Sequence, residues 1–132
     1  MSVFVDTSAI LALLNSEDIN HKQAQELWRT LIDDEVPMVS TVYVLSESFA
    51  LVQSRLGIQA ARAVHEIIRP YLFVEWGDEN LYQEAASAVL VANRRSLSLV
   101  DCVSFVVMRR FGIITTFAFD NHFSEQGFVL LT

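Results

Sequence analysis

The stretch Ser2-Val3-Phe4-Val5-Asp6-Thr7-Ser8 decides the fold of this 132-residue chain. It is a short apolar, β-branched run that stops at one acid and two hydroxyl residues, and a helical pattern of apolar residues follows directly over residues 9–14. This order is typical of a buried strand that leads straight into a helix. The sequence therefore begins with a strand–helix unit in which Asp6 stands at the carboxyl end of the strand.

The alternation of strand and helix continues along the chain. Helices are expected around residues 24–31 and over residues 42–56, 58–69, 78–93 and 98–111, and short strands at residues 37–40, 71–76, 113–116 and 128–131. Because these strands are continuously apolar rather than alternating, both faces of their sheet should be covered by helices. The predicted fold class is α/β, a three-layer αβα sandwich with a mostly parallel central sheet.

Composition narrows the class of protein further. Hydrophobic residues make up 52% and charged residues 19%, which is enough apolar material for a packed core and argues against disorder. The length indicates one domain spanning residues 1–132. The single cysteine, Cys102, excludes an internal disulfide framework and a thiolate zinc site. No apolar run approaches the length needed to cross a bilayer, so we expect no membrane association and a cytoplasmic location.

Charge placement is more informative than net charge. The net charge of −7 argues against binding nucleic acid through a basic face, although acids gathered at one metal site would be neutralised by the ion. Four acids stand among apolar residues or next to the end of a predicted strand or helix, namely Asp6, Glu47, Asp101 and Asp120. Taken singly, each has a structural explanation, because three suit helix caps or turns and Glu47 can face solvent.

Glu47 and His122 leave alternatives open. On a helical wheel Glu47 lies opposite an apolar stripe, so a solvent-facing position competes with a place in a site. The stripe consists of Val42, Leu45, Phe49, Val52 and Leu56. His122 could contact a substrate phosphate, but a turn-stabilising position beside Phe123 is the preferred interpretation.

Taken together, the four acids indicate a metal site. An αβ sandwich can bring two strand ends, a helix N-terminus and a neighbouring helix face around one crevice. Carboxylates gathered there would repel one another and raise each other's pKa unless a cation compensates. All-oxygen ligation suits Mg²⁺ or Mn²⁺, which can stabilise charge on a phosphate and lower the pKa of an attacking water.

Four sequence segments carry a family resemblance, in the family's order and spacing. They are Val5-Asp6-Thr7-Ser8, Ser46-Glu47, Leu97-Ser98-Leu99-Val100-Asp101, and Phe119-Asp120-Asn121-His122-Phe123 followed by Gly127-Phe128. On these motifs the chain resembles the PIN-domain nucleases, and its single-domain length is similar to that of toxins from VapBC-type toxin–antitoxin pairs. One departure is Ala118, where relatives often carry Ser or Thr.

The resemblance implies a function and a set of site residues. Asp6, Glu47, Asp101 and Asp120 would bind the metal and carry catalysis, with secondary contacts from Ser8 and Asn121. The implied activity is Mg²⁺-dependent (or Mn²⁺-dependent) endoribonuclease hydrolysis of RNA phosphodiester bonds. The implied partners are an RNA substrate, a second copy of the chain in a homodimer, and a small antitoxin protein.

Two other functions remain possible on the sequence alone. The first is a catalytically weak PIN-fold module for dimerisation and protein binding, favoured by the high apolar content and by helices such as residues 58–69. The second is a receiver or haloacid-dehalogenase-like domain with a nucleophilic Asp6. That second alternative lacks the usual charge-stabilising lysine, because Lys22 is the only lysine and lies far from the late strands.

Overall fold

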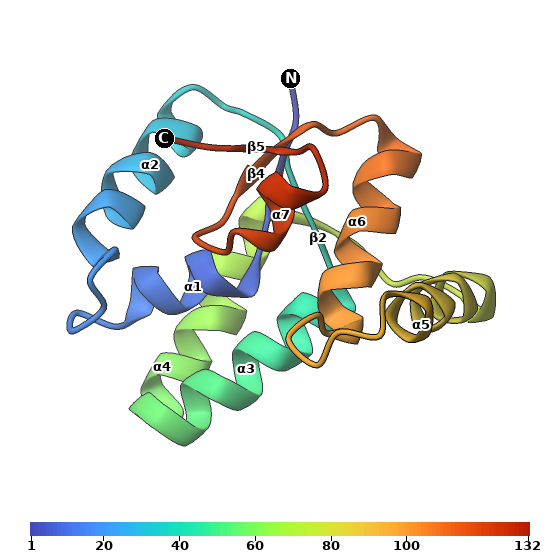
Figure 1. The fold of residues 1–132 in the computed structure, drawn as a ribbon. Coiled ribbons are helices and arrows are strands. Elements are labelled where there is room, and N and C mark those ends of the chain that lie inside the picture. Colours follow the sequence, from blue (N-terminus) through green and yellow to red (C-terminus); the bar gives the residue numbers. More distant parts are fainter.

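The computed structural model describes residues 1–132, and its centre is a five-stranded sheet (Figure 1). The strands are β1 (Val3–Val5), β2 (Met38–Thr41), β3 (Leu72–Glu75), β4 (Thr115–Phe117) and β5 (Val129–Leu130). They are arranged in the order β3-β2-β1-β4-β5, and every neighbouring pair is parallel. The predicted parallel αβα sandwich is therefore confirmed.

Seven α-helices surround the sheet. They are α1 (Thr7–Leu14), α2 (His21–Asp33), α3 (Val42–Leu56), α4 (Ile58–Ala63), α5 (Glu79–Ala92), α6 (Leu99–Phe111) and α7 (His122–Glu125). In Figure 1, α2 lies on one side of the strands and α5 and α6 lie on the other, while α3 and α4 form a hairpin that projects from the carboxyl end of β2. None of these helices combines the length and the apolar character that a membrane span requires.

The first strand is central because its side chains are apolar on both faces. Val3, Phe4 and Val5 are fully buried within one hydrophobic cluster of 29 residues. Its neighbours β2 and β4 pair with it directly. Chain direction is the same in all five strands, so the carboxyl ends of β1, β2 and β4 open toward one edge of the sheet.

The predicted helix over residues 58–69 is not a regular α-helix. It is α4 followed by a π-helical turn, η1 (Val64–Ile68), and a 3₁₀ turn, η2 (Arg69–Tyr71). Pro70 lies at the start of η2, where its missing backbone N–H prevents the α-helical hydrogen bonding from continuing. The spacing of apolar residues over residues 58–69 does not predict the wider π-helical turn of η1.

Two features near the C-terminus also differ from the prediction. The strand expected at residues 113–116 is β4 at Thr115–Phe117, because Ile113 N donates to Met108 O at 2.8 Å and still belongs to the end of α6. This closure follows Gly112, whose φ of 67° is the left-handed conformation that glycine favours after a helix. The short helix α7 was not predicted, since residues 120–123 have the composition of a turn.

The apolar stripe of α3 is only partly buried in the core. The buried residues of this helix are Val44, Ser48 and Val52, whereas Phe49 of the stripe is 40% exposed. Three stripe residues, Val42, Leu45 and Phe49, line an open groove against η1. Glu47 follows the buried Val44 by three residues, so it shares a helix face with the core rather than standing opposite it.

Candidate active site

Two neighbouring strand ends bring Asp6 and Asp120 into the same region. Asp6 directly follows β1, and Asp120 lies three residues beyond the end of β4. The backbone N–H of Asp6 donates to Phe117 O at 3.1 Å, which extends the pairing of β1 with β4 to the edge of the sheet. Parallel pairing is thus the reason that two acids 114 positions apart in the sequence meet.

Ser8 connects Asp6 to the segment that carries Asp120. Asp6 is the N-cap of α1, and its Oδ2 accepts hydrogen bonds from Ser8 N at 3.1 Å and from Ser8 Oγ at 2.6 Å. The same Ser8 Oγ accepts a hydrogen bond from Phe119 N at 2.9 Å. One hydroxyl therefore fixes both the orientation of the Asp6 carboxylate and the path of the β4–α7 loop, which lies beside the start of α1 (Figure 1).

Asp101 is held by the N-terminal turn of α6. Ser98 caps this helix, and a reciprocal pair of hydrogen bonds joins Ser98 Oγ to Asp101 N at 3.0 Å and Ser98 N to Asp101 Oδ2 at 3.2 Å. Asp101 is only 8% exposed. The predicted capping position of Asp101 is thus confirmed. A carboxylate that caps a helix can also contribute to a metal site.

His122 stands between two of the acids. Its Nδ1 lies 3.1 Å from Asp120 Oδ1 and 3.3 Å from Asp101 Oδ2. Ligand atoms of these three residues all lie within 4.8 Å of one another. The sequence interpretation, a turn-stabilising histidine, misses this arrangement. The signal that could have found it is the Asp-Asn-His spacing, which places an imidazole two residues beyond a strand-end carboxylate.

Asp6 has the electrostatic character of a site residue. It is 4% exposed, and its pKa is raised from 3.8 to about 6. Burial is the main cause, the two hydrogen bonds from Ser8 oppose it, and the negative charges of Asp101 and Asp120 add to the increase. The three acids therefore act on one another at close range, and a cation among them would relieve their repulsion.

Glu47 and Asn121 lie differently from these three acids. Glu47 is half-buried on α3, which packs against both α1 and α6, but its carboxylate is outside the group of Asp101, Asp120 and His122 and makes no hydrogen bond or ion pair. Asn121 is exposed at the start of α7, and its carbonyl accepts a hydrogen bond from Ser124 Oγ. Their contribution to a site stays a prediction.

The donor set fits a divalent metal ion. Carboxylate oxygens of Asp101 and Asp120 and the nitrogen of His122 converge, and the Asp6 carboxylate is close enough to sense both charges. His122 Nδ1 is buried and has no hydrogen-bond partner despite its two carboxylate neighbours. An unpartnered buried nitrogen facing two acids is the environment that a cation would complete.

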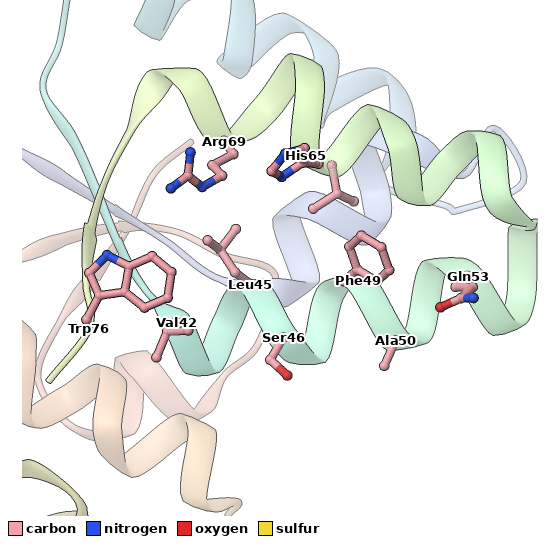
Figure 2. Close-up of a pocket in the computed structure, with 10 residues that line it drawn as sticks. Val42, Leu45, Ser46, Phe49, Ala50, Gln53, His65, Arg69 and Trp76 are labelled. Atoms are coloured by element: carbon pink, nitrogen blue, oxygen red, sulfur yellow. The ribbon is translucent and has the colours of Figure 1, made fainter. Parts of the chain in front are cut away.

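A second feature is the groove between α3 and η1 (Figure 2). Its volume is about 520 Å³, six of its ten lining residues are hydrophobic, and none is acidic. His65 in η1 and Arg69 in η2 lie across the groove from the side chains of α3, and Trp76 lies at one end. The lining residues on α3 include Leu45 and Phe49.

Comparison with known proteins assigns a family. The PIN-domain sequence profile matches residues 3–129. The chain belongs to the PIN-domain family. Proteins named 23S rRNA-specific endonuclease VapC20, from two strains of Mycobacterium tuberculosis (CDC 1551 / Oshkosh and ATCC 25618 / H37Rv), are each 38% identical to this PIN domain over 129 residues, which is 96% of this chain and 95% of theirs.

A solved structure supports the same assignment for this PIN domain. The crystal structure of M. tuberculosis VapC20, described as a sarcin–ricin loop cleaving toxin, superposes with a TM-score of 0.86 and 36% sequence identity, covering 97% of each chain. The suspected family resemblance is therefore confirmed. The alternative of a receiver or haloacid-dehalogenase-like domain is set aside, because the family match covers nearly the whole chain.

Proposed function

We propose that this PIN domain, acting as a single domain of residues 1–132, is a divalent-metal-dependent endoribonuclease and the toxin of a toxin–antitoxin pair. One observation carries the proposal. Asp101 and Asp120 converge within one cluster, and the charges of both add to the increase in the pKa of Asp6 that its burial mainly causes. The relatives named as endonucleases support the same reaction class.

The catalytic contribution of the chain is to hold acids that would otherwise repel one another. Asp6, Asp101 and Asp120 bind the ion, Glu47 extends the acidic set from α3, and Ser8 fixes the Asp6 carboxylate through its hydroxyl. A bound Mg²⁺ or Mn²⁺ would stabilise negative charge on the scissile phosphate and make water a stronger nucleophile. No side-chain nucleophile is proposed.

The substrate class is RNA, and a structured loop is the first substrate to test. Relatives at 38% identity are named for 23S rRNA, and the solved relative for the sarcin–ricin loop. We propose a loop of the large ribosomal RNA as the target of this chain too. The net charge of −7 makes a purely electrostatic, sequence-independent mode of RNA binding unfavourable, which favours recognition of one folded loop.

The expected result is cleavage of a sarcin–ricin hairpin oligonucleotide in Mn²⁺ or Mg²⁺ and none in excess chelator. Cleavage should return when the ion is restored, because the carboxylates of Asp101 and Asp120 are proposed to act through it. Denaturing gels of end-labelled RNA measure the product. A scrambled hairpin of the same length is the control for loop recognition, and cleavage that continues unchanged in chelator would contradict the metal requirement.

We further propose that the groove between α3 and η1 receives an apolar, acidic segment of a small antitoxin, and that the toxin is a homodimer. The groove offers exposed apolar side chains and two basic groups, His65 and Arg69, with no acid among its lining residues. Charge complementarity therefore favours a partner segment that carries carboxylates between apolar residues.

Phe49→Arg is expected to weaken antitoxin binding at least about 10-fold, because it replaces an apolar groove wall with a charge. The measurement is sedimentation velocity with the product of any small reading frame that adjoins the gene. Leu90→Arg is the matched control, since Leu90 is 77% exposed on α5 and outside the groove. Equal binding by both variants would contradict this assignment.

Sedimentation of the chain alone should give a dimer, and loss of that dimer in Phe49→Arg would assign the groove to the second copy instead.

A further inference from the structure

We propose that His122 is a metal ligand, and that its Nδ1 joins carboxylate oxygens of Asp101 and Asp120 in a mixed nitrogen–oxygen set that favours Mn²⁺ over Mg²⁺. The inference rests on the proposed function, because it concerns the same metal site. The inference adds a nitrogen ligand to the proposed carboxylate ligands. It also predicts that the site binds Mn²⁺ in preference to Mg²⁺, which the carboxylates alone do not decide.

The distances between the donor atoms fit neighbouring positions around one ion. An octahedral ion with donors at about 2.1 Å places adjacent donors about 3.0 Å apart. The distances from His122 Nδ1 are 3.1 Å to Asp120 Oδ1 and 3.3 Å to Asp101 Oδ2. All three donor atoms lie within 4.8 Å of one another, which also allows the two oxygens to occupy either adjacent or opposite positions.

No well-aligned hydrogen bond occupies His122 Nδ1, and its two carboxylate contacts are ion pairs only when the ring is protonated. A buried ring nitrogen is normally satisfied by a hydrogen bond, yet Nδ1 has no aligned partner although two carboxylates lie within 3.3 Å. The hydrogen bond is made instead by the backbone, since His122 N donates to Asp120 Oδ1 at 2.8 Å. That backbone contact fixes the Asp120 carboxylate beside the ring and positions both groups without using the ring nitrogen.

The chemistry of the donor set predicts the preference. Carboxylates alone suit Mg²⁺, whereas an imidazole ligand favours first-row transition ions, and Mn²⁺ accepts both donor types. Mg²⁺ retains its waters and gains little from a nitrogen donor. Removal of the imidazole should therefore cost Mn²⁺ affinity about 10-fold or more and leave Mg²⁺ affinity nearly unchanged.

Electron spin-echo envelope modulation of the protein loaded with Mn²⁺ alone tests the assignment directly. A coordinated imidazole gives a ¹⁴N modulation on the Mn²⁺ signal, which is expected in the wild type and absent in His122→Asn. His65→Asn is the matched control, because His65 lies in the α3–η1 groove, outside the acidic cluster, and should leave the modulation intact. Titration calorimetry of the same proteins with Mn²⁺ and Mg²⁺ measures the change in preference.

The outcomes separate this inference from the proposed function. Mn²⁺ that binds the wild type without ¹⁴N modulation would overturn the ligand assignment and leave the nuclease proposal standing. A wild type that binds Mg²⁺ but not Mn²⁺ would also overturn the ligand assignment alone, and one that binds neither ion would overturn both. The wild-type spectrum decides the question even if His122→Asn folds poorly, and His122→Gln provides a second variant with an oxygen-donating side chain in place of the ring.

Discussion

The Asp101→Asn variant is expected to cleave RNA at least about 100-fold more slowly than the wild type, with its fold unchanged. The substitution removes a negative charge from the group formed with Asp120 and His122, so the proposed ion loses a carboxylate ligand. Asparagine keeps an oxygen that can accept the hydrogen bond from Ser98 N, which preserves the cap of α6. Initial rates at saturating Mn²⁺, compared with melting temperatures of the metal-free proteins, separate loss of chemistry from loss of structure.

The chain offers a matched control for that substitution. Asp78 also caps a helix, since it is the N-cap of α5 and accepts a hydrogen bond from Leu81 N at 2.9 Å, but it lies outside the acidic cluster. Asp78→Asn should therefore cleave RNA at the wild-type rate. If Asp101→Asn retained activity within a few-fold of Asp78→Asn, the assignment of Asp101 to the metal site would be wrong.

Asp6→Asn is expected to stabilise the metal-free protein at neutral pH, although it should also abolish cleavage. The folded-state pKa of Asp6 is about 6 against an ordinary 3.8, so the folded chain holds this proton more tightly than the unfolded chain. Stability therefore falls as pH rises from about 4 to 6, and above that range the ionised, buried Asp6 costs roughly 3 kcal/mol. Asparagine carries no charge and remains a good N-cap for α1.

Thermal melts in chelator at pH 4.5 and pH 7.5 measure this effect. The melting temperature of Asp6→Asn should exceed that of the wild type by roughly 10 °C at the higher pH, with a much smaller difference at the lower pH. In Mn²⁺ the wild type should have the higher melting temperature of the two proteins, since only the wild type retains all the carboxylates that bind the ion. A variant that is less stable than the wild type at pH 7.5 in chelator would show that the Asp6 charge is not penalised.

Local sequence signals predicted those parts of the site that depend on local structure. Asp6 at the end of a β-branched run and Asp101 three residues after Ser98 are strand-end and capping patterns, and both are found as expected. The meeting of Asp6 with Asp120 follows from parallel pairing, which the continuously apolar strands indicated. The physical link between these acids, the Ser8 hydroxyl that also binds Phe119 N, was expected only as an unspecified contact.

The remaining features depend on packing that the local pattern does not contain. Part of the apolar stripe of α3 lines a groove while Val52 is buried in the core, so hydrophobic periodicity alone does not decide which way Glu47 faces. The place of His122 depends on α6 approaching the β4–α7 loop, which brings Asp101 within 3.3 Å of the ring. The π-helical turn η1 likewise has no signature in hydrophobic periodicity.

The central claim is that folding gathers acids from distant parts of the chain around one divalent ion. Anomalous diffraction from a crystal soaked in Mn²⁺ tests it most directly. The account predicts a strong anomalous peak within about 2.5 Å of carboxylate oxygens of both Asp101 and Asp120, on the side that faces Asp6. Well-ordered crystals in saturating Mn²⁺ that show peaks only at other surface acids, with this group of carboxylates unliganded, would contradict it.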